Sequence, residues 1–254
     1  MINIYFVGTA GSGKSSLVRA FKEWMTLQGL DCITVNLDPG AEFIPYDVDV
    51  DIREWVNVPD VMEEYELGPN GAQVVCADLM AMRASEMAEV IETFKTNYVL
   101  IDTPGQIELF AFRKSSEVII DALGRDNSFL VFLSDPHLSK SPVGFISSLM
   151  LCATVQFRFS LPFLNVLSKA DMLKEEELMN VINWSMDPDN LNYALTDGGV
   201  DPRTVLNIEF FRALESVGMF REIVPVSSEA KEGFEDIYDA VQETFEGGED
   251  LRSD

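Results

Sequence analysis

Short apolar runs rich in β-branched and aromatic residues alternate with segments of helical hydrophobic spacing along most of the chain. Runs of this length predict buried strands, and the intervening stretches are long enough to hold crossover helices. The expected strands are Ile2–Val7, Cys32–Leu37, Tyr98–Ile101, Phe129–Leu133, Phe163–Leu167 and Ile223–Val226. This alternation predicts an α/β fold with a mainly parallel, doubly wound sheet and helices on both faces.

Helical spacing is clearest after the first and the last expected strand, over 17–27 and 234–245. Apolar residues recur there at three- and four-residue steps, as in an amphipathic helix. The segment 143–159 differs because it is apolar nearly all round, which predicts a helix covered either by its own fold or by another chain. Since it contains Gln156 and Arg158, it does not have the composition of a bilayer span.

One segment departs from the alternating rhythm. Residues 174–207 contain an acidic helical pattern over 175–184 and end near a Gly198-Gly199 turn. We expect a helical insertion on the rim of a single domain that spans 1–246. Residues 247–254 have the composition of a flexible acidic tail.

Composition narrows the class of protein. The chain has 254 residues, of which 47% are hydrophobic and 24% charged, as in ordinary globular proteins. A formal net charge of −25 argues against broad binding of nucleic acid or of an anionic membrane. The acidity indicates a solvated surface or, alternatively, basic protein partners. Three widely spaced cysteines in apolar contexts fit reduced thiols, and no signal peptide is recognisable, so we expect a cytoplasmic protein.

A glycine-rich loop directly follows the first expected strand, with the sequence Gly8-Thr9-Ala10-Gly11-Ser12-Gly13-Lys14-Ser15. It matches the phosphate-binding pattern G-x-x-x-x-G-K-[ST] at every fixed position. Glycines let backbone N–H groups surround a phosphate, Lys14 brings a cation to the β and γ oxygens, and Ser15 offers its hydroxyl to Mg²⁺. We therefore expect a nucleoside triphosphate with Mg²⁺, bound by Gly11, Ser12, Gly13, Lys14, Ser15 and Ser16.

Two acidic residues stand at the ends of expected strands. Asp102 opens the sequence Asp102-Thr103-Pro104-Gly105-Gln106, and such a carboxylate reaches the magnesium, usually through water, while the Gly105 backbone can approach the γ-phosphate. Asp38 ends the second strand, where a carboxylate can orient or deprotonate the attacking water. Initiating a turn before Pro39 is the alternative role for Asp38.

The fifth and last strands end in sequences suited to a purine base. Ser168-Lys169-Ala170-Asp171 resembles the guanine-reading element N-K-x-D of GTPases. The carboxylate of Asp171 can accept hydrogen bonds from both N1–H and the exocyclic amine of guanine, and the stem of Lys169 can cover the base. Ser168 replaces the usual asparagine and removes one amide contact. Ser227 and Ser228 resemble the S-A-K element that presents backbone N–H groups to the guanine oxygen. GTP is therefore the expected substrate.

A tight turn is predicted at Gly68-Pro69-Asn70-Gly71, with Pro fixing one dihedral and Asn or Gly adopting a left-handed one. It lies between Asp38 and Asp102, where P-loop GTPases have their switch. With the phosphate loop, D-T-P-G-Q and S-K-x-D in order, the chain resembles the GPN-loop GTPases from Ile2 to about Phe245.

This resemblance implies a homodimer in which Gly68, Pro69 and Asn70 of each subunit enter the partner's site. Asn70 would contact the terminal or leaving phosphate there. The resemblance also implies that Asp38 and Gln106 position the attacking water, that Glu108 supports the turn, and that Lys14 supplies charge to the transferred group.

The expected activity is hydrolysis of GTP to GDP and phosphate by a dimeric switch. Family relatives are associated with RNA polymerase assembly, which implies an assembly or chaperone-like role on protein partners, without direct contact to nucleic acid or membrane. Two alternatives remain: a P-loop kinase that phosphorylates a small acceptor, and a nucleotide-binding module that does not hydrolyse. An acidic 174–207 segment speaks against the arginine-rich lid of a kinase.

Three isolated residues receive structural interpretations. His137 follows Asp135-Pro136 and is expected to be a turn residue instead of a base. Arg53 and Arg113 could each face a phosphate, but no pattern selects either, so we expect surface or salt-bridge roles.

Overall fold

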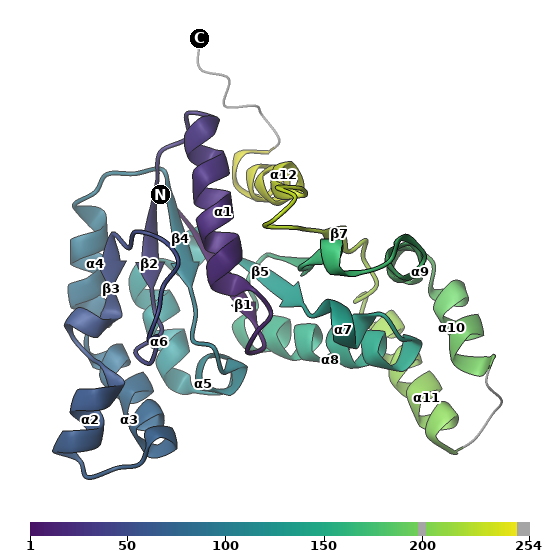
Figure 1. Ribbon diagram of the computed structural model, residues 1–254, viewed down its shortest axis with the longest axis horizontal. Helices are drawn as coiled ribbons and strands as arrows, with labels where there is room; N and C mark the ends of the chain where they lie inside the picture. Colours follow the sequence, from purple (N-terminus) through teal and green to yellow (C-terminus); the bar gives the residue numbers. More distant parts are fainter. Residues whose placement is uncertain (198–201, 248–254) are drawn as a thin grey trace.

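The computed structural model describes residues 1–197 and 202–247, and its centre is one sheet of seven parallel strands in the order β3-β2-β4-β1-β5-β6-β7 (Figure 1). The strands are β1 (Ile2–Gly8), β2 (Cys32–Asn36), β3 (Val50–Asp51), β4 (Tyr98–Asp102), β5 (Ser128–Ser134), β6 (Phe163–Leu167) and β7 (Val224–Pro225). The α/β prediction is confirmed. Every expected strand is present, although the last is confined to the two residues of β7.

Helices cover both faces of the sheet, as Figure 1 shows. Their bounds are α1 (Lys14–Leu27), α2 (Val58–Glu64), α3 (Pro69–Met82), α4 (Ala84–Glu92), α5 (Ile107–Ala111), α6 (Lys114–Leu123), α7 (Pro136–Ser139), α8 (Pro142–Phe159), α9 (Glu175–Met186), α10 (Pro188–Thr196), α11 (Pro202–Ser216) and α12 (Phe234–Glu246). Both helices with the clearest spacing, α1 and α12, form close to the expected bounds.

Side chains of β1 alternate between two hydrophobic cores, because successive residues of a strand point to opposite faces. Ile4 and Phe6 face α1 and α12, where the ring of Phe6 lies 6.0 Å from that of Phe21. Tyr5 and Val7 face the other core, beneath α5 and α8. Both faces are buried, which explains why β1 reads as a continuous apolar run.

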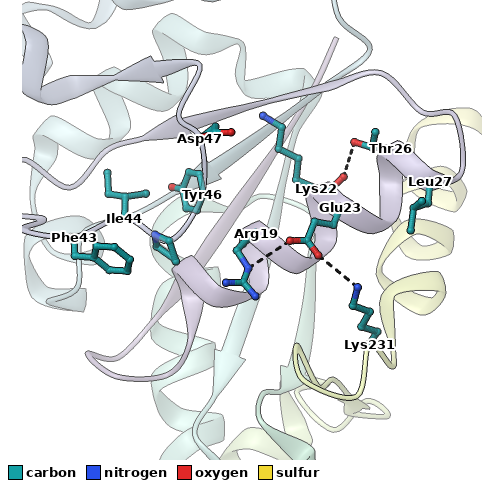
Figure 2. Close-up of a pocket in the computed structure, with 11 residues that line it drawn as sticks. Arg19, Lys22, Glu23, Thr26, Leu27, Phe43, Ile44, Tyr46, Asp47 and Lys231 are labelled. Atoms are coloured by element: carbon teal, nitrogen blue, oxygen red, sulfur yellow. Dashed lines mark hydrogen bonds and ion pairs between the residues drawn. The ribbon is translucent and has the colours of Figure 1, made fainter.

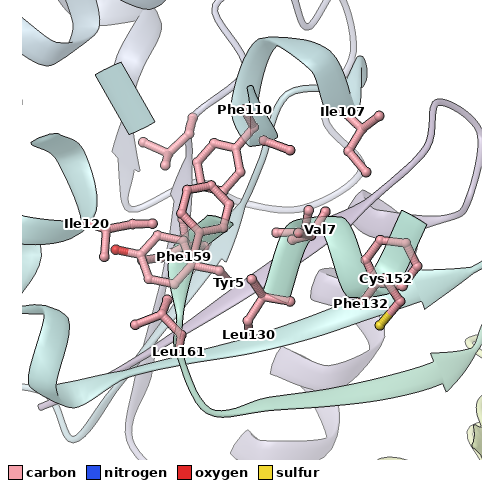
Figure 3. Close-up of a cluster of buried hydrophobic side chains, with 14 of the residues drawn as sticks. Tyr5, Val7, Ile107, Phe110, Ile120, Leu130, Phe132, Cys152, Phe159 and Leu161 are labelled. Carbon is pink, nitrogen blue, oxygen red and sulfur yellow. The ribbon is translucent and has the colours of Figure 1, made fainter. Parts of the chain in front are cut away.

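The second core contains a group of aromatic rings among aliphatic side chains (Figure 3). Phe110 of α5 lies 6.2 Å from the ring of Tyr5 and 5.2 Å from that of Phe159, at the end of α8. This packing seats α5, the helix that directly follows the Asp102 motif, on the sheet. The loop between β4 and α5 is therefore held between two well-packed elements.

The strand order reverses at β1. This strand lies between β4 and β5, with β2 and β3 beyond β4 and with β6 and β7 beyond β5. In open parallel sheets, ligands bind outside the carboxyl ends of strands at such a reversal. The loop 8–15 leaves β1 at this position and leads into α1.

The helix α8 confirms that the apolar segment 143–159 is helical and that its own fold covers one face of it. Phe145, Leu149 and Cys152 are buried against the rest of the chain, whereas Phe157 is 89% exposed. By length and mean hydropathy, 1.3, α8 also meets the minimum for a membrane-crossing helix, a test that buried core helices pass too. The three cysteines are free thiols, as expected.

The helical insertion extends further than 174–207. Its helices α9, α10 and α11 pack in sequence, and α11 continues to Ser216, against α8. The expected end at Asn207 was wrong because no glycine interrupts α11 before Gly218, where φ is +71°. The predicted turn at 198–199 and the tail residues 248–254 lie outside the described residues.

Candidate functional site

The phosphate loop closes around its own lysine. Gly11 and Gly13 have φ of +77° and +95°, values that residues with a Cβ rarely adopt. The Lys14 ammonium donates to the carbonyl oxygens of Gly8 and Thr9, each at 3.0 Å. Backbone N–H groups at the start of α1 are left open toward the carboxyl edge of the sheet, an arrangement that suits a phosphate.

Lys14 is 5% exposed and lies among carboxylates. Burial lowers the pKa of its ammonium, while the charges of Asp102 and Asp38 act in the opposite direction. The lysine is thus positioned beside two anions at the mouth of the phosphate loop. Both strand-end carboxylates predicted to serve the site therefore do lie around Lys14.

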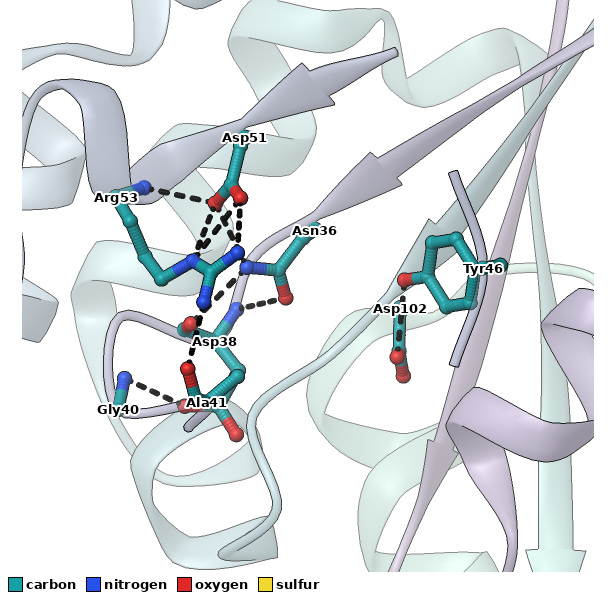
Figure 4. A network of polar contacts seen from close by, with 8 residues as sticks. All are labelled: Asn36, Asp38, Gly40, Ala41, Tyr46, Asp51, Arg53 and Asp102. Atoms are coloured by element: carbon teal, nitrogen blue, oxygen red, sulfur yellow. Dashed lines mark hydrogen bonds and ion pairs between the residues drawn. The ribbon is translucent and has the colours of Figure 1, made fainter. Parts of the chain in front are cut away.

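Asp102 is 3% exposed, and its two oxygens differ. The hydroxyl of Tyr46 donates to Oδ2 at 3.1 Å, whereas Oδ1 is buried without a hydrogen-bond partner (Figure 4). Burial raises the pKa of Asp102 to about 6, against the opposing effects of the nearby Ser15 and Tyr46 hydroxyls and of Lys14. Burial also raises the pKa of Tyr46, so its hydroxyl remains a donor at neutral pH.

These residues fit a magnesium ion. A buried carboxylate oxygen without a donor, next to a serine hydroxyl, lacks the positive partner that its burial calls for. Mg²⁺ is commonly held by one or two protein oxygens together with phosphates and waters. Within the described residues, no group of three or more acidic, His or Cys side chains forms a separate metal site.

Asp38 reaches across from β2 to the loop after β4. Its Oδ2 accepts the Gly105 N–H at 3.0 Å, and its Oδ1 accepts the Gly40 N–H at 2.9 Å. The bond to Gly40 is the contact expected if Asp38 only initiates the turn before Pro39. The bond to Gly105 goes further, because it joins the carboxylate to the backbone group that the sequence assigns to the γ-phosphate.

A polar network that sequence reasoning missed holds the segment around Asp38. Asn36 donates to the Asp38 carbonyl at 3.1 Å and to Asp51 at 2.9 Å, and its Oδ1 accepts the Asp38 N–H (Figure 4). Arg53 binds Asp51 through several N–H groups and donates to the Ala41 carbonyl at 2.8 Å. Asp51 ends the edge strand β3, whose two residues carry no periodic signal by which the sequence could have shown this network.

Hydrogen bonds dominate the electrostatics of this network. Burial alone would raise the pKa of Asp51, but the bonds from Arg53 and Asn36 outweigh it and hold that pKa below its usual value. Arg53 is thus a salt-bridge residue, as expected. Arg113 pairs with Asp78 at 2.7 Å, again as expected.

The expected base-binding residues line one cavity of about 190 Å³ beside the phosphate loop, which includes Ser168, Lys169, Asp171 and Ser228. The Ser168 hydroxyl donates to the Ser12 carbonyl at 2.6 Å, so it ties the base-binding loop to the phosphate loop. Lys169 donates to the Gly11 carbonyl at 2.7 Å.

Ser227 is buried behind this cavity and contacts one of the residues that line it. Its hydroxyl donates to Asp171 Oδ1, which orients the carboxylate. Asp171 retains its other oxygen for a ligand that offers N–H donors. Such an arrangement matches the Watson–Crick edge of guanine, which presents two neighbouring donors.

Gln106 and Glu108 lie beside the Asp102 motif, at the start of α5, and both are exposed. The structure brings neither side chain into a hydrogen bond with the described residues. His137 lies in the one-turn helix α7, where its backbone N–H donates to the Asp135 carboxylate at 2.8 Å, in agreement with a turn role.

The Gly68-Pro69-Asn70 segment begins a helix and is not a left-handed turn. Gly68 precedes α3 with φ of −73°, and Pro69 is its first residue, a position that proline favours. The positive φ occurs two residues earlier, at Glu66. Asn70 is exposed, and its side chain has no hydrogen-bond partner among the described residues.

A second cavity, of about 790 Å³, lies between α1 and the segment 43–47 (Figure 2). Tyr46 forms part of its wall, across from Arg19 and Lys22 of α1. The same tyrosine binds Asp102, so this cavity adjoins the metal side of the site.

The phosphate loop, Asp102, Asp38 and the base cavity all follow the carboxyl ends of strands at the same edge of the sheet. This arrangement can hold a nucleotide by its phosphates and its base and can place a carboxylate near the terminal phosphate. Comparisons with known proteins agree. Residues 6–247 match a family described as "Conserved hypothetical ATP binding protein".

Curated relatives carry a more specific name. The chain is 32% identical to GPN-loop GTPase PAB0955 of Pyrococcus abyssi over 92% of this chain and 93% of that protein. It is 30% identical to GPN-loop GTPase 1 of Dictyostelium discoideum over 86% of this chain, but spans only 57% of that protein's length. The crystal structure of PAB0955 in its apo form superposes with a TM-score of 0.85 over 96% of this chain and 97% of that one.

Proposed function

This chain belongs to the GPN-loop GTPases, P-loop enzymes that act on GTP, and from that premise we propose that it hydrolyses GTP to GDP and phosphate with Mg²⁺, as a homodimeric switch. The observation that carries the proposal is the contact between Asp38 and the Gly105 N–H, 3.0 Å apart, beside Lys14. It supports the proposal because the Gly105 N–H is the backbone group that we assign to the terminal phosphate.

The residues of one subunit divide the work. Gly11, Ser12 and Gly13 surround the phosphates, and Lys14 exchanges its two carbonyl contacts for phosphate oxygens. Ser15 and Asp102 hold Mg²⁺, which neutralises developing charge on the β- and γ-phosphate oxygens when bound. Positioning and electrostatic stabilisation account for most of the rate in such reactions.

Asp38 acts on the attacking water. When the γ-phosphate accepts the hydrogen bond from the Gly105 N–H, Asp38 Oδ2 loses that donor. The lone pair that is freed on Oδ2 can then accept a hydrogen bond from a water molecule. The bond to Gly40 and the network through Asn36 keep the segment in place during that exchange. Gln106 directly follows Gly105 in the sequence and orients the same water from the start of α5.

Asn70 completes the site of the partner subunit. It is exposed at the N-terminus of α3, where backbone N–H groups also point outward and favour an anion. An exposed asparagine amide without a partner among the described residues is available to donate to a phosphate across an interface. Glu108, also exposed, supports the loop that receives it.

The cellular role follows from the family resemblance. Nucleotide-dependent changes in this dimer serve the assembly of protein complexes such as RNA polymerase, through protein contacts in the cytoplasm. The net charge of −25 supports partners with basic surfaces instead of nucleic acid or membrane.

The test is turnover without any acceptor molecule. We expect the protein with Mg²⁺ and GTP to release GDP and phosphate in equal amounts, and to turn over ATP far more slowly because Asp171 selects guanine. Phosphate transfer only after a second substrate is added would identify a kinase. Tight GTP binding with no turnover by the dimer would identify a binding module.

A further inference from the structure

Tyr46 binds Asp102, the proposed magnesium ligand, from a distant part of the sequence. It lies 56 residues before Asp102 in sequence, in the segment that joins β2 to β3, yet its hydroxyl donates to Asp102 Oδ2 at 3.1 Å (Figure 4). Its ring also packs against the hydrophobic core that contains β1 and α1. A phenol held in this way directs one oxygen of the carboxylate.

The other carboxylate oxygen is left free. Oδ1 of Asp102 is buried and has no hydrogen-bond partner among the described residues, and the Ser15 hydroxyl lies close enough to this carboxylate to lower its pKa. A carboxylate with one oxygen bound and the other unpaired has a defined rotation about its last bond. The unpaired oxygen would then be available to the magnesium site.

Contacts that flank Tyr46 fix its position. The Thr34 hydroxyl donates to the Asp47 carbonyl at 2.8 Å, and the Thr34 N–H donates to the Asp49 carboxylate at 2.8 Å. Lys22 of α1 binds the same Asp49 carboxylate at 2.7 Å. The tyrosine is therefore attached both to the sheet and to the helix that follows the phosphate loop.

We infer that Tyr46 is a positioning residue for the site that would hold Mg²⁺, because its hydroxyl binds Oδ2 of Asp102 and so keeps Oδ1 open for the metal. This inference rests on the proposed nucleotide function. Partners that orient a metal's carboxylate or histidine ligands typically change metal affinity 10- to 100-fold when they are removed. The aromatic ring has a separate role in packing.

Tyr46→Phe tests the inference, because it removes the hydroxyl and keeps the ring. The probe is a fluorescent GDP analogue, whose release rate is measured in EDTA and across a Mg²⁺ titration, so that no hydrolysis is required. We expect the release rate in EDTA to stay within about twofold of wild type and the half-saturating Mg²⁺ concentration to rise about tenfold. Tyr193→Phe, which alters a tyrosine of α10 that is 74% exposed, is the matched control and should leave both values unchanged.

Two results would overturn the inference. One is an unchanged half-saturating Mg²⁺ concentration in Tyr46→Phe. The other is an equal acceleration of release in EDTA and in Mg²⁺, which indicates a packing defect alone. If wild type hydrolyses GTP and either result is obtained, only the role of Tyr46 fails. If wild type binds no guanine nucleotide, the proposed function fails, and the inference falls with it.

Discussion

Two regions at the proposed site are built in opposite ways. The segment from Asn36 to Arg53 is bound to its surroundings by a network of hydrogen bonds, and its key carboxylate, Asp38, already has a partner in Gly105. The start of α3 is exposed, and Asn70 has no partner within the described residues. The contacts of the first region lie within one chain, whereas the role that we propose for the second requires another molecule.

The largest effect is expected from Asp38→Asn. The amide keeps an oxygen for the Gly105 N–H but loses the charge that orients and deprotonates water. We predict a fall in kcat of about 1,000-fold with GTP affinity retained, within the range of general acid–base catalysis. Single-turnover phosphate release together with GTP binding measures both. Retained turnover would remove Asp38 from the chemistry and leave it the turn role.

Asn70→Ala probes the exposed region. Because the side chain has no partner in the part of the chain that the structure describes, its removal should leave stability and the GTP affinity of monomers unchanged. We predict that kcat falls about 100-fold, as when one donor to developing charge is lost. Thermal unfolding and steady-state turnover at high protein concentration check this. Wild-type turnover by the variant would mean that the start of α3 does not act in catalysis together with the segment that holds Asp38.

Arg53→Ala tests whether the bound region needs its network. Loss of the contacts to Asp51 and Ala41 should loosen the segment and move Asp38, which we expect to lower kcat about tenfold with KM changed less than about twofold. Arg53→Lys restores the charge without the planar fork and should recover only part of the loss. A fall in kcat that is matched by a proportional fall in the folded fraction of the protein would indicate a purely structural contact.

An effect of similar size concerns pH. With a pKa of about 6, Asp102 is mostly ionised at pH 7 and mostly protonated at pH 5 in the metal-free protein. Mg²⁺ requires the ionised form, so its apparent affinity in the GDP complex should fall about tenfold from pH 7 to pH 5. Asp102→Asn removes this titration and should flatten the profile. A steep profile in that variant would assign the dependence to another group.

The sequence predicted this fold well where the signals are local. Buried strands such as β1 and the pattern G-x-x-x-x-G-K-[ST] are readable over a few residues. Asp38, Asp102 and Asp171 could be placed at one edge because parallel strands end there together. The two-residue β3 is too short for any periodic signal, and the network through Asp51 and Arg53 depends on it.

Other features required coordinates for different reasons. The contact from Tyr46 to Asp102 joins residues that no spacing rule connects. A proline suits both the second position of a turn and the first position of a helix, so Pro69 did not decide between them. The helix α3 continues because the residues after Asn70 pack against the core.

Subunit complementation tests the shared site most directly. Lys14→Ala subunits keep Asn70, and Asn70→Ala subunits keep Lys14, so a mixed dimer contains one pocket with both residues. After exchange at equal amounts, about half of the dimers are mixed, and we predict recovery to about a quarter of wild-type activity. Activity of the mixture equal to the average of the two separate variants, with mixed dimers demonstrated, would contradict the account.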